Sequence, residues 1–104
     1  ADMLQGMTAR EYEYYVAHVL CEHGWDAHAT KGSADQGIDV IAVRDGLKVV
    51  IQCKLYSSAV GNAAVQEIIA GREFVKADFA AVVSNIQYTL HAKRLAASSD
   101  VLLL

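Results

Sequence analysis

The segment from residue 37 to residue 54 constrains the fold more than any other part of the chain. It holds two apolar, β-branched runs that are joined by the dipeptide Asp45-Gly46. An Asp-Gly pair between such runs is the strongest short-range signal for a β-hairpin with a two-residue turn. Counting outward from this turn places Ile41 opposite Val50, so the sequence predicts an antiparallel hairpin with a defined register.

Three polar residues interrupt the far end of this apolar hairpin. The same counting places Asp39 directly opposite Gln52, and residues that face each other across two strands share one face of the sheet. Because side chains alternate along a strand, Lys54 lies on the same face as Gln52. Burying charge costs free energy, so a carboxylate, an amide and an ammonium group at one place point to a function rather than to stability.

These three groups are the parts needed for metal-assisted hydrolysis of a phosphodiester. An aspartate supplies a hard oxygen ligand for Mg²⁺, and a glutamine amide oxygen can add a weaker, uncharged one. A bound divalent cation lowers the pKa of its water, and a neighbouring lysine can hold that water or stabilise the transition state. Each residue also has a plainer interpretation: Asp39 could bond the start of a strand, Gln52 could be a satisfied core amide, and Lys54 could be solvated.

Composition sets the size and class of the protein. The chain has 104 residues, of which 54% are hydrophobic, enough for one domain with its own core. No apolar run approaches the ~20 residues that cross a bilayer, so we expect a soluble protein without a membrane partner. Cys21 and Cys53 lie in apolar contexts, which predicts buried free thiols and a cytoplasmic location. The start at Ala1 without Met suggests a piece of a longer protein.

Hydrophobic periodicity and turn residues divide the chain into elements. We expect a lead-in or linker over residues 1–7 and a single domain over residues 8–104. The predicted elements of this domain are a helix over 8–23, a strand over 25–30, the hairpin, a helix over 61–75, a strand over 79–84, a helix over 89–98 and a strand over 100–104. The order αβββαβαβ combines an antiparallel hairpin with strands joined through helices, which pair in parallel. The predicted fold class is therefore α/β, a mixed sheet with helices on both faces.

The first predicted helix has clear end signals. Thr8 and Glu11 match a capping box, and Gly24 is a typical residue just after a helix end. Glu13 lies beside the apolar stripe of this helix, so its carboxylate is either a solvated surface charge or directed at whatever the helix packs on.

The motifs of the hairpin resemble a known family. Gly37-Ile38-Asp39-Val40, followed across the turn by Ile51-Gln52-Cys53-Lys54, resembles the PD-(D/E)XK restriction-endonuclease-like superfamily. The closest likeness is to the Mrr-type catalytic domain, in which glutamine replaces the acid before X-Lys. The resemblance covers nearly the whole chain and implies a restriction-endonuclease-like fold, with residues 8–104 as an endonuclease-like catalytic domain that cleaves DNA.

The resemblance also implies roles for individual residues. Asp39, Gln52 and Lys54 match the catalytic motif, and Glu13 matches a position that often supplies an additional carboxylate. Asp39, Gln52 and Glu13 would then hold Mg²⁺, for which Mn²⁺ can substitute. Asp35 and Gln66 match pattern positions with a nucleic-acid-binding or supporting role; from the residues alone, Asp35 is either a turn residue or part of a cation site.

The negative net charge of the chain argues against tight DNA binding by this domain alone. The formal net charge is −3, whereas a protein that binds DNA tightly by itself usually carries a basic excess. We therefore expect a separate target-recognition domain in the full-length protein, and a homodimer is a further possible assembly. Two alternatives to a restriction-type endonuclease stay open: a Holliday-junction or repair nuclease, and a nuclease-derived DNA-binding or interaction module that no longer cleaves.

Overall fold

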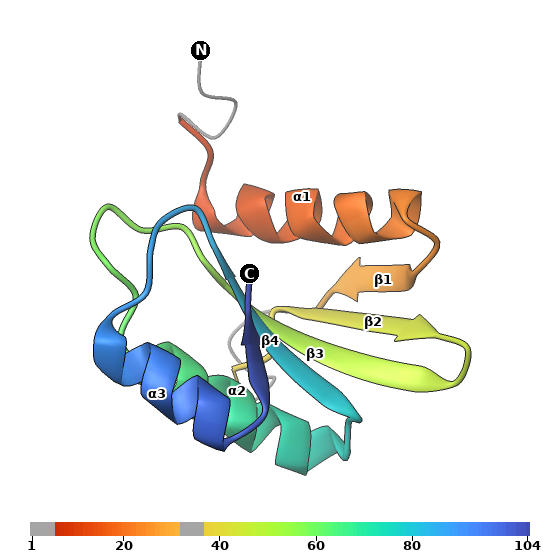
Figure 1. Ribbon diagram of the computed structural model, residues 1–104. Helices are drawn as coiled ribbons and strands as arrows, with labels where there is room; N and C mark the ends of the chain where they lie inside the picture. Colours follow the sequence, from red (N-terminus) through yellow and green to blue (C-terminus); the bar gives the residue numbers. More distant parts are fainter. Residues whose placement is uncertain (1–5, 32–36) are drawn as a thin grey trace.

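The computed structural model describes residues 6–31 and 37–104, which form one five-stranded sheet with helices on both faces (Figure 1). The elements are α1 (Ala9–Glu22), β1 (Asp26–Ala29), β2 (Val40–Arg44), β3 (Leu47–Lys54), α2 (Asn62–Val75), β4 (Phe79–Ser84), α3 (Leu90–Ser98) and β5 (Val101–Leu103). Their order is the predicted one, and their bounds match the predicted bounds to within one residue at each end, except that β2 begins three residues after the start of the predicted hairpin segment. Within the described ranges, no helix combines the length and the apolar character that a membrane span requires.

The sheet has the strand order β1-β2-β3-β4-β5. The three strands from β1 to β3 pair antiparallel, whereas β3, β4 and β5 pair parallel. The switch follows from the connections, because a two-residue turn reverses the chain and a helical crossover returns it in the same direction. β4 lies inside the sheet, as its uninterrupted apolar sequence predicted.

The hairpin turn has the backbone that the Asp-Gly pair favours. Asp45 and Gly46 both have positive φ, 52° and 79°, as a type I′ turn requires. The predicted pairing of Ile41 with Val50 is confirmed, and the paired register runs back as far as Val40 and Ile51.

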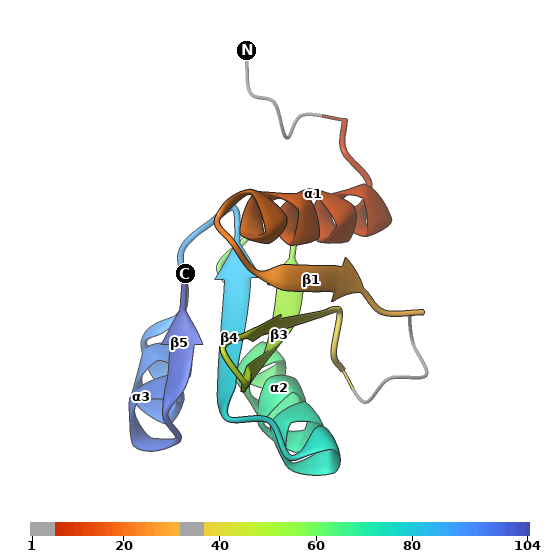
Figure 2. The ribbon, with the colours of Figure 1, turned by 90° about the vertical axis from the view of Figure 1, so that its right-hand side faces the viewer.

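Helices lie on both sides of the sheet (Figure 2), and one cluster of apolar side chains packs against each face. Val50 and Ile51 are consecutive on β3 and therefore point to opposite faces, where both are almost fully buried. Ile51 packs with Tyr12 of α1, and Val50 packs with Ile68 of α2 on the other face. The predicted helices on both faces are confirmed, and the sheet between them is the platform that carries the polar residues of the hairpin.

Both ends of α1 lie where the capping residues of the sequence predicted them. Thr8 and Glu11 form the predicted capping box, and Gly24 follows the helix with a φ of 92°.

Both cysteines are free thiols. Cys53 is half-buried, whereas Cys21 is exposed near the end of α1, so the expectation that both would be buried was wrong for Cys21. The apolar stripe of α1 runs through Tyr12 and Val16 and leaves Cys21 at its margin.

Candidate active site

The hairpin departs from regular pairing where β2 begins. The Asp39 backbone N–H donates to the Ile51 carbonyl (2.9 Å), although Ile51 is already the register partner of Val40. Two residues of one strand thus oppose one residue of the other, which is the arrangement of a β-bulge. The regular ladder therefore ends at Val40 and Ile51, one pair before the expected Asp39–Gln52 pair.

The Asp39 carboxylate still contacts Gln52, the residue that was predicted to lie opposite it. Asp39 Oδ2 accepts hydrogen bonds from the Gln52 side-chain Nε2 (3.1 Å) and from the Cys53 backbone N–H (2.8 Å). The Gln52 amide must point its nitrogen at Asp39, since the opposite orientation would set its oxygen against a carboxylate. Gln52 is only 5% exposed, and its Oε1 is buried without a hydrogen-bond partner among residues 6–31 and 37–104.

Lys54 lies at the end of β3 between two neighbours that the sequence analysis did not assign to the site. Its Nζ is 3.7 Å from Glu67 Oε2 of α2 and 5.5 Å from the centre of the Tyr56 ring, and its side chain is 16% exposed. Gln66, the residue of α2 that was assigned, is exposed, and within the described part of the chain no hydrogen bond or ion pair joins it to the site. The α2 residue that reaches the site is therefore Glu67.

Glu13 approaches the same end of the sheet from α1. Its side chain is 14% exposed and pairs with Arg10, whose Nη1 lies 2.6 Å from Glu13 Oε1. Arg10 also donates through Nη2 to the Thr30 carbonyl (2.5 Å), at the end of β1. Glu13 is thus not the solvated surface charge that was one of its two interpretations. Asp35, the remaining predicted residue, lies outside the described residues.

Thr30 hydrogen-bonds to the backbone carbonyls of Ile38 and Asp39. It is 7% exposed; its hydroxyl donates to the Ile38 carbonyl (2.6 Å), and its N–H donates to the Asp39 carbonyl (2.9 Å). Buried polar groups need partners, so these two bonds hold both carbonyls next to the bulge in place. Thr30 was not among the predicted site residues, because a single threonine after a strand carries no distinctive signal in the sequence.

The environment makes the Asp39 carboxylate costly to ionise. Burial, with the nearby charges of Glu13 and Glu67, raises the pKa of Asp39 to about 6, while the Cys53 N–H and Lys54 act in the opposite direction. Burial and the carboxylates of Asp39 and Glu13 also raise the pKa of the Cys53 thiol. The Cys53 thiol is therefore protonated at neutral pH. Groups with strongly perturbed pKa values concentrate at functional sites.

The donor set fits a hard divalent cation. The Gln52 amide oxygen has no hydrogen-bond donor in the described part of the chain and lies beside a carboxylate whose pKa is raised, so the two are oxygen ligands that a cation would satisfy. A side chain at residue 37 would crowd the amide oxygen, because a Cβ there would lie 3.2 Å from Gln52 Oε1. No group of three His, Cys, Asp or Glu side chains in the described ranges could hold a metal, so a cation here would depend on Gln52 and on further ligands such as water or phosphate.

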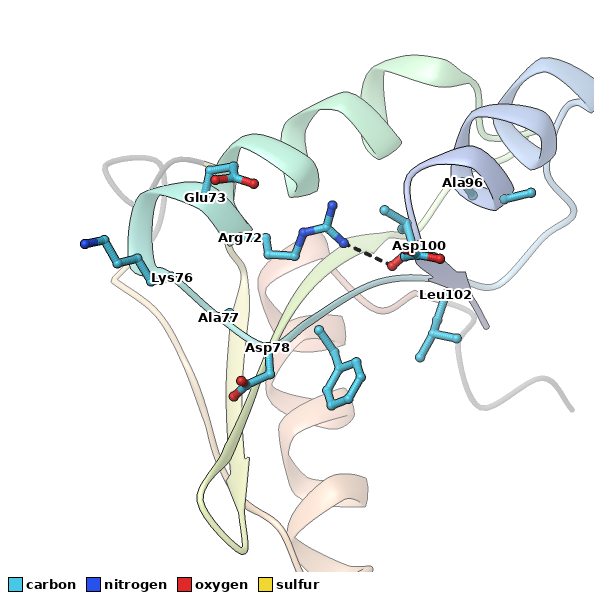
Figure 3. Close-up of a pocket in the computed structure, with 11 residues that line it drawn as sticks. Arg72, Glu73, Lys76, Ala77, Asp78, Ala96, Asp100 and Leu102 are labelled. Carbon is cyan, nitrogen blue, oxygen red and sulfur yellow. Dashed lines mark hydrogen bonds between the residues drawn. The ribbon is translucent and has the colours of Figure 1, made fainter.

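A large cavity lies at the opposite end of the sheet (Figure 3). Its volume is about 890 Å³, and its lining includes Asp78 and Phe79 at the start of β4, whereas Lys54 pairs with Ser84 at the end of that strand. Arg72 in this cavity donates to the carbonyls of Ser99 and Asp100 just after α3. The Arg72 guanidinium thus supplies hydrogen-bond donors to carbonyl groups at the end of a neighbouring helix, which is a structural role.

The mixed sheet, its central hairpin and the Asp39, Gln52 and Lys54 side chains at one end define a restriction-endonuclease-like fold. More specifically, the chain belongs to the restriction endonuclease family of the Mrr_cat model, which matches residues 4–104. The predicted family is confirmed by this match, and it supports a nuclease as the general class of the domain. No curated protein sequence matches the chain.

Three solved structures share the fold. A protein of unknown function, AF1548, has a TM-score of 0.79 and 24% identity over 92% of this chain. MspJI restriction endonuclease, solved with a 27-mer oligonucleotide, has a TM-score of 0.67 and 17% identity over 96% of this chain. EndoMS in its apo form has a TM-score of 0.59 and 20% identity over 88% of this chain. The chain covers only 57%, 26% and 44% of these three proteins, respectively.

Proposed function

We propose that this domain is a metal-dependent endonuclease that hydrolyses phosphodiester bonds in DNA. The observation that carries the proposal is the buried Oε1 of Gln52, which has no hydrogen-bond partner among residues 6–31 and 37–104 and belongs to a side chain that contacts the Asp39 carboxylate. A folded chain gains nothing from leaving such an acceptor without a donor, because the lost hydrogen bond to water is not replaced. A bound cation would replace it.

The residues have distinct roles in this proposal. Asp39 and Gln52 would hold Mg²⁺, or Mn²⁺ in its place, and Glu13 is the additional carboxylate that the family resemblance suggests. The cation, when bound, lowers the pKa of its water and offsets negative charge on the phosphoryl group. Lys54 keeps its ammonium at the mouth of the site, where it can orient the attacking water and stabilise the charge that builds up on the phosphate.

Glutamine in place of an acid has a consequence for metal affinity. It removes one negative charge from the ligand set, so Mg²⁺ binds weakly until a DNA phosphate adds its own oxygens. The formal net charge of −3 likewise provides little attraction for a polyanion. We therefore propose that a separate domain selects the target sequence, and that this domain supplies the cleavage step.

The test is a cleavage assay on supercoiled and linear duplex DNA with Mg²⁺ or Mn²⁺. We expect nicking or cleavage that EDTA abolishes and that Lys54→Ala reduces to background. Lys93→Ala removes an exposed lysine of α3 and should cleave as the unchanged protein does. No cleavage by the unchanged protein with either metal would favour the non-cleaving module. A stable symmetric dimer that prefers branched DNA would favour a junction or repair nuclease.

A further inference from the structure

Glu67 is a charged residue beside Lys54 to which neither the motif nor the proposed metal set gives a role. It lies on α2, on the face that packs over β3, and its carboxylate is 3.7 Å from the Lys54 ammonium. With 45% of its side chain exposed, this ion pair adds little to stability. Glu67 also raises the pKa of Asp39, so its charge works against the carboxylate beside it. A residue with little structural benefit and an electrostatic cost calls for another explanation.

A glycine at residue 37 allows Glu67 to lie close to the start of β2. Gly37 has a φ of 76°, which residues with a side chain rarely adopt. A Cβ at residue 37 would lie 3.1 Å from both the Cβ and the backbone carbonyl of Glu67. The absence of a side chain at Gly37 is what lets α2 approach the start of β2 at this residue. A Cβ at residue 37 would also lie 3.2 Å from Gln52 Oε1, so Gly37 packs against both Glu67 and the amide ligand.

The Lys54 ammonium has a second neighbour, the ring of Tyr56. The Tyr56 ring lies 5.5 Å from Lys54 Nζ, within the range of a cation–π contact. Asn85, just after β4, holds the Tyr56 backbone from both sides: its Oδ1 accepts from the Tyr56 N–H, and its Nδ2 donates to the Tyr56 carbonyl (both 2.9 Å). The segments that follow β3 and β4 run side by side at this point (Figure 1). The lysine ammonium is thus held between a carboxylate from one element and a ring from another.

We propose that Glu67 is a positioning residue that holds the Lys54 ammonium in place for phosphodiester hydrolysis. A lysine side chain has many rotamers, and a reacting group that is free to leave its position loses much of its effect on rate. The Glu67 carboxylate limits those rotamers without touching the DNA. The inference rests on the proposed function, because it assigns Glu67 a role in the same reaction.

Two measurements on Glu67→Gln test the proposal, with Glu73→Gln as the matched control. Glu73 is an exposed glutamate on the same helix, about 9 Å further along its axis, so both variants lose one negative charge from α2. The first measurement is the NMR order parameter of the Lys54 Cε methylene without metal or DNA. We expect this group to be more ordered than that of exposed Lys93, to approach Lys93 in Glu67→Gln, and to stay unchanged in Glu73→Gln. Equal order in the unchanged protein and Glu67→Gln would overturn the proposal.

The second measurement separates catalysis from binding. At saturating DNA, we expect the single-turnover cleavage rate of Glu67→Gln to fall roughly tenfold to a hundredfold. DNA affinity should stay the same or increase, because the variant removes a negative charge. Thermal unfolding of the variant confirms that it is folded. An unchanged rate in a folded Glu67→Gln also overturns the proposal. If the unchanged protein cleaves no DNA, the proposed function fails, and the NMR comparison by itself decides whether Glu67 holds Lys54.

Discussion

Replacing Asp39 with asparagine should remove activity and yet stabilise the fold. The folded-state pKa of Asp39 is about 6, against an ordinary value of 3.8, because the carboxylate is partly buried and lies near Glu13 and Glu67. Asparagine has nearly the same shape, and its oxygen can still accept from the Cys53 N–H and from Gln52 Nε2. The substitution therefore removes the charge and keeps the contacts.

The size of the effect follows from linkage. At 1.36 kcal/mol per pKa unit, the difference between 3.8 and about 6 corresponds to at most about 3 kcal/mol. Asp39 is only partly buried, so screening by water reduces the expected gain to about 1–2 kcal/mol. The folded state binds the proton more tightly than the unfolded chain does. The ionised carboxylate is therefore destabilising above pH ~6, about half as much at pH 5, and not at all below the unfolded pKa.

Urea unfolding in EDTA measures this gain without interference from metal. We expect the free energy of unfolding of Asp39→Asn to exceed that of the unchanged protein at pH 8, and by about half as much at pH 5. Asp26→Asn, which removes an exposed carboxylate on β1, should show no comparable gain. The reasoning is refuted if Asp39→Asn is no more stable at pH 8, or if its gain is the same at both pH values.

Two further substitutions probe the ligands and their support. Gln52→Glu places a second carboxylate beside Asp39, so we expect apo stability at pH 8 to fall by about 1–3 kcal/mol and Mn²⁺ affinity, measured by calorimetry, to rise roughly tenfold. Unchanged Mn²⁺ affinity would argue against Gln52 as a ligand. Thr30→Val keeps the side-chain shape but removes the donor to the Ile38 carbonyl, so urea unfolding should show a loss of about 1–2 kcal/mol and the cleavage rate should fall. A normal rate in this variant would mean that the bulge holds Asp39 without the hydroxyl.

Local patterns predicted most of the architecture. The Asp-Gly turn at residues 45–46 set the hairpin, and the capping box at Thr8 marked the start of α1. These features depend on residues close together in the chain, so the sequence displays them directly. The same counting brought Asp39, Gln52 and Lys54 to one end of the hairpin, because a two-residue turn leaves little freedom in the register.

The exact geometry of that end was not predictable in the same way. Pattern counting placed Asp39 directly opposite Gln52, whereas a bulge places its backbone against Ile51, and its carboxylate accepts from the Cys53 N–H. A bulge adds one residue to one strand without a strong local signature. The capping and apolar patterns likewise left two interpretations of Glu13, which its ion pair with Arg10 decided.

The sequence by itself determined the family, the order of the elements and the three polar residues of the hairpin. Only the tertiary structure decided which side chains surround them, namely Thr30 just after β1, Glu13 from α1 and Glu67 from α2. Gln66 and Glu67 are neighbours in sequence, and the orientation of α2 over β3 determines which of them reaches Lys54. Packing between distant segments sets that orientation, and no short stretch of sequence records it.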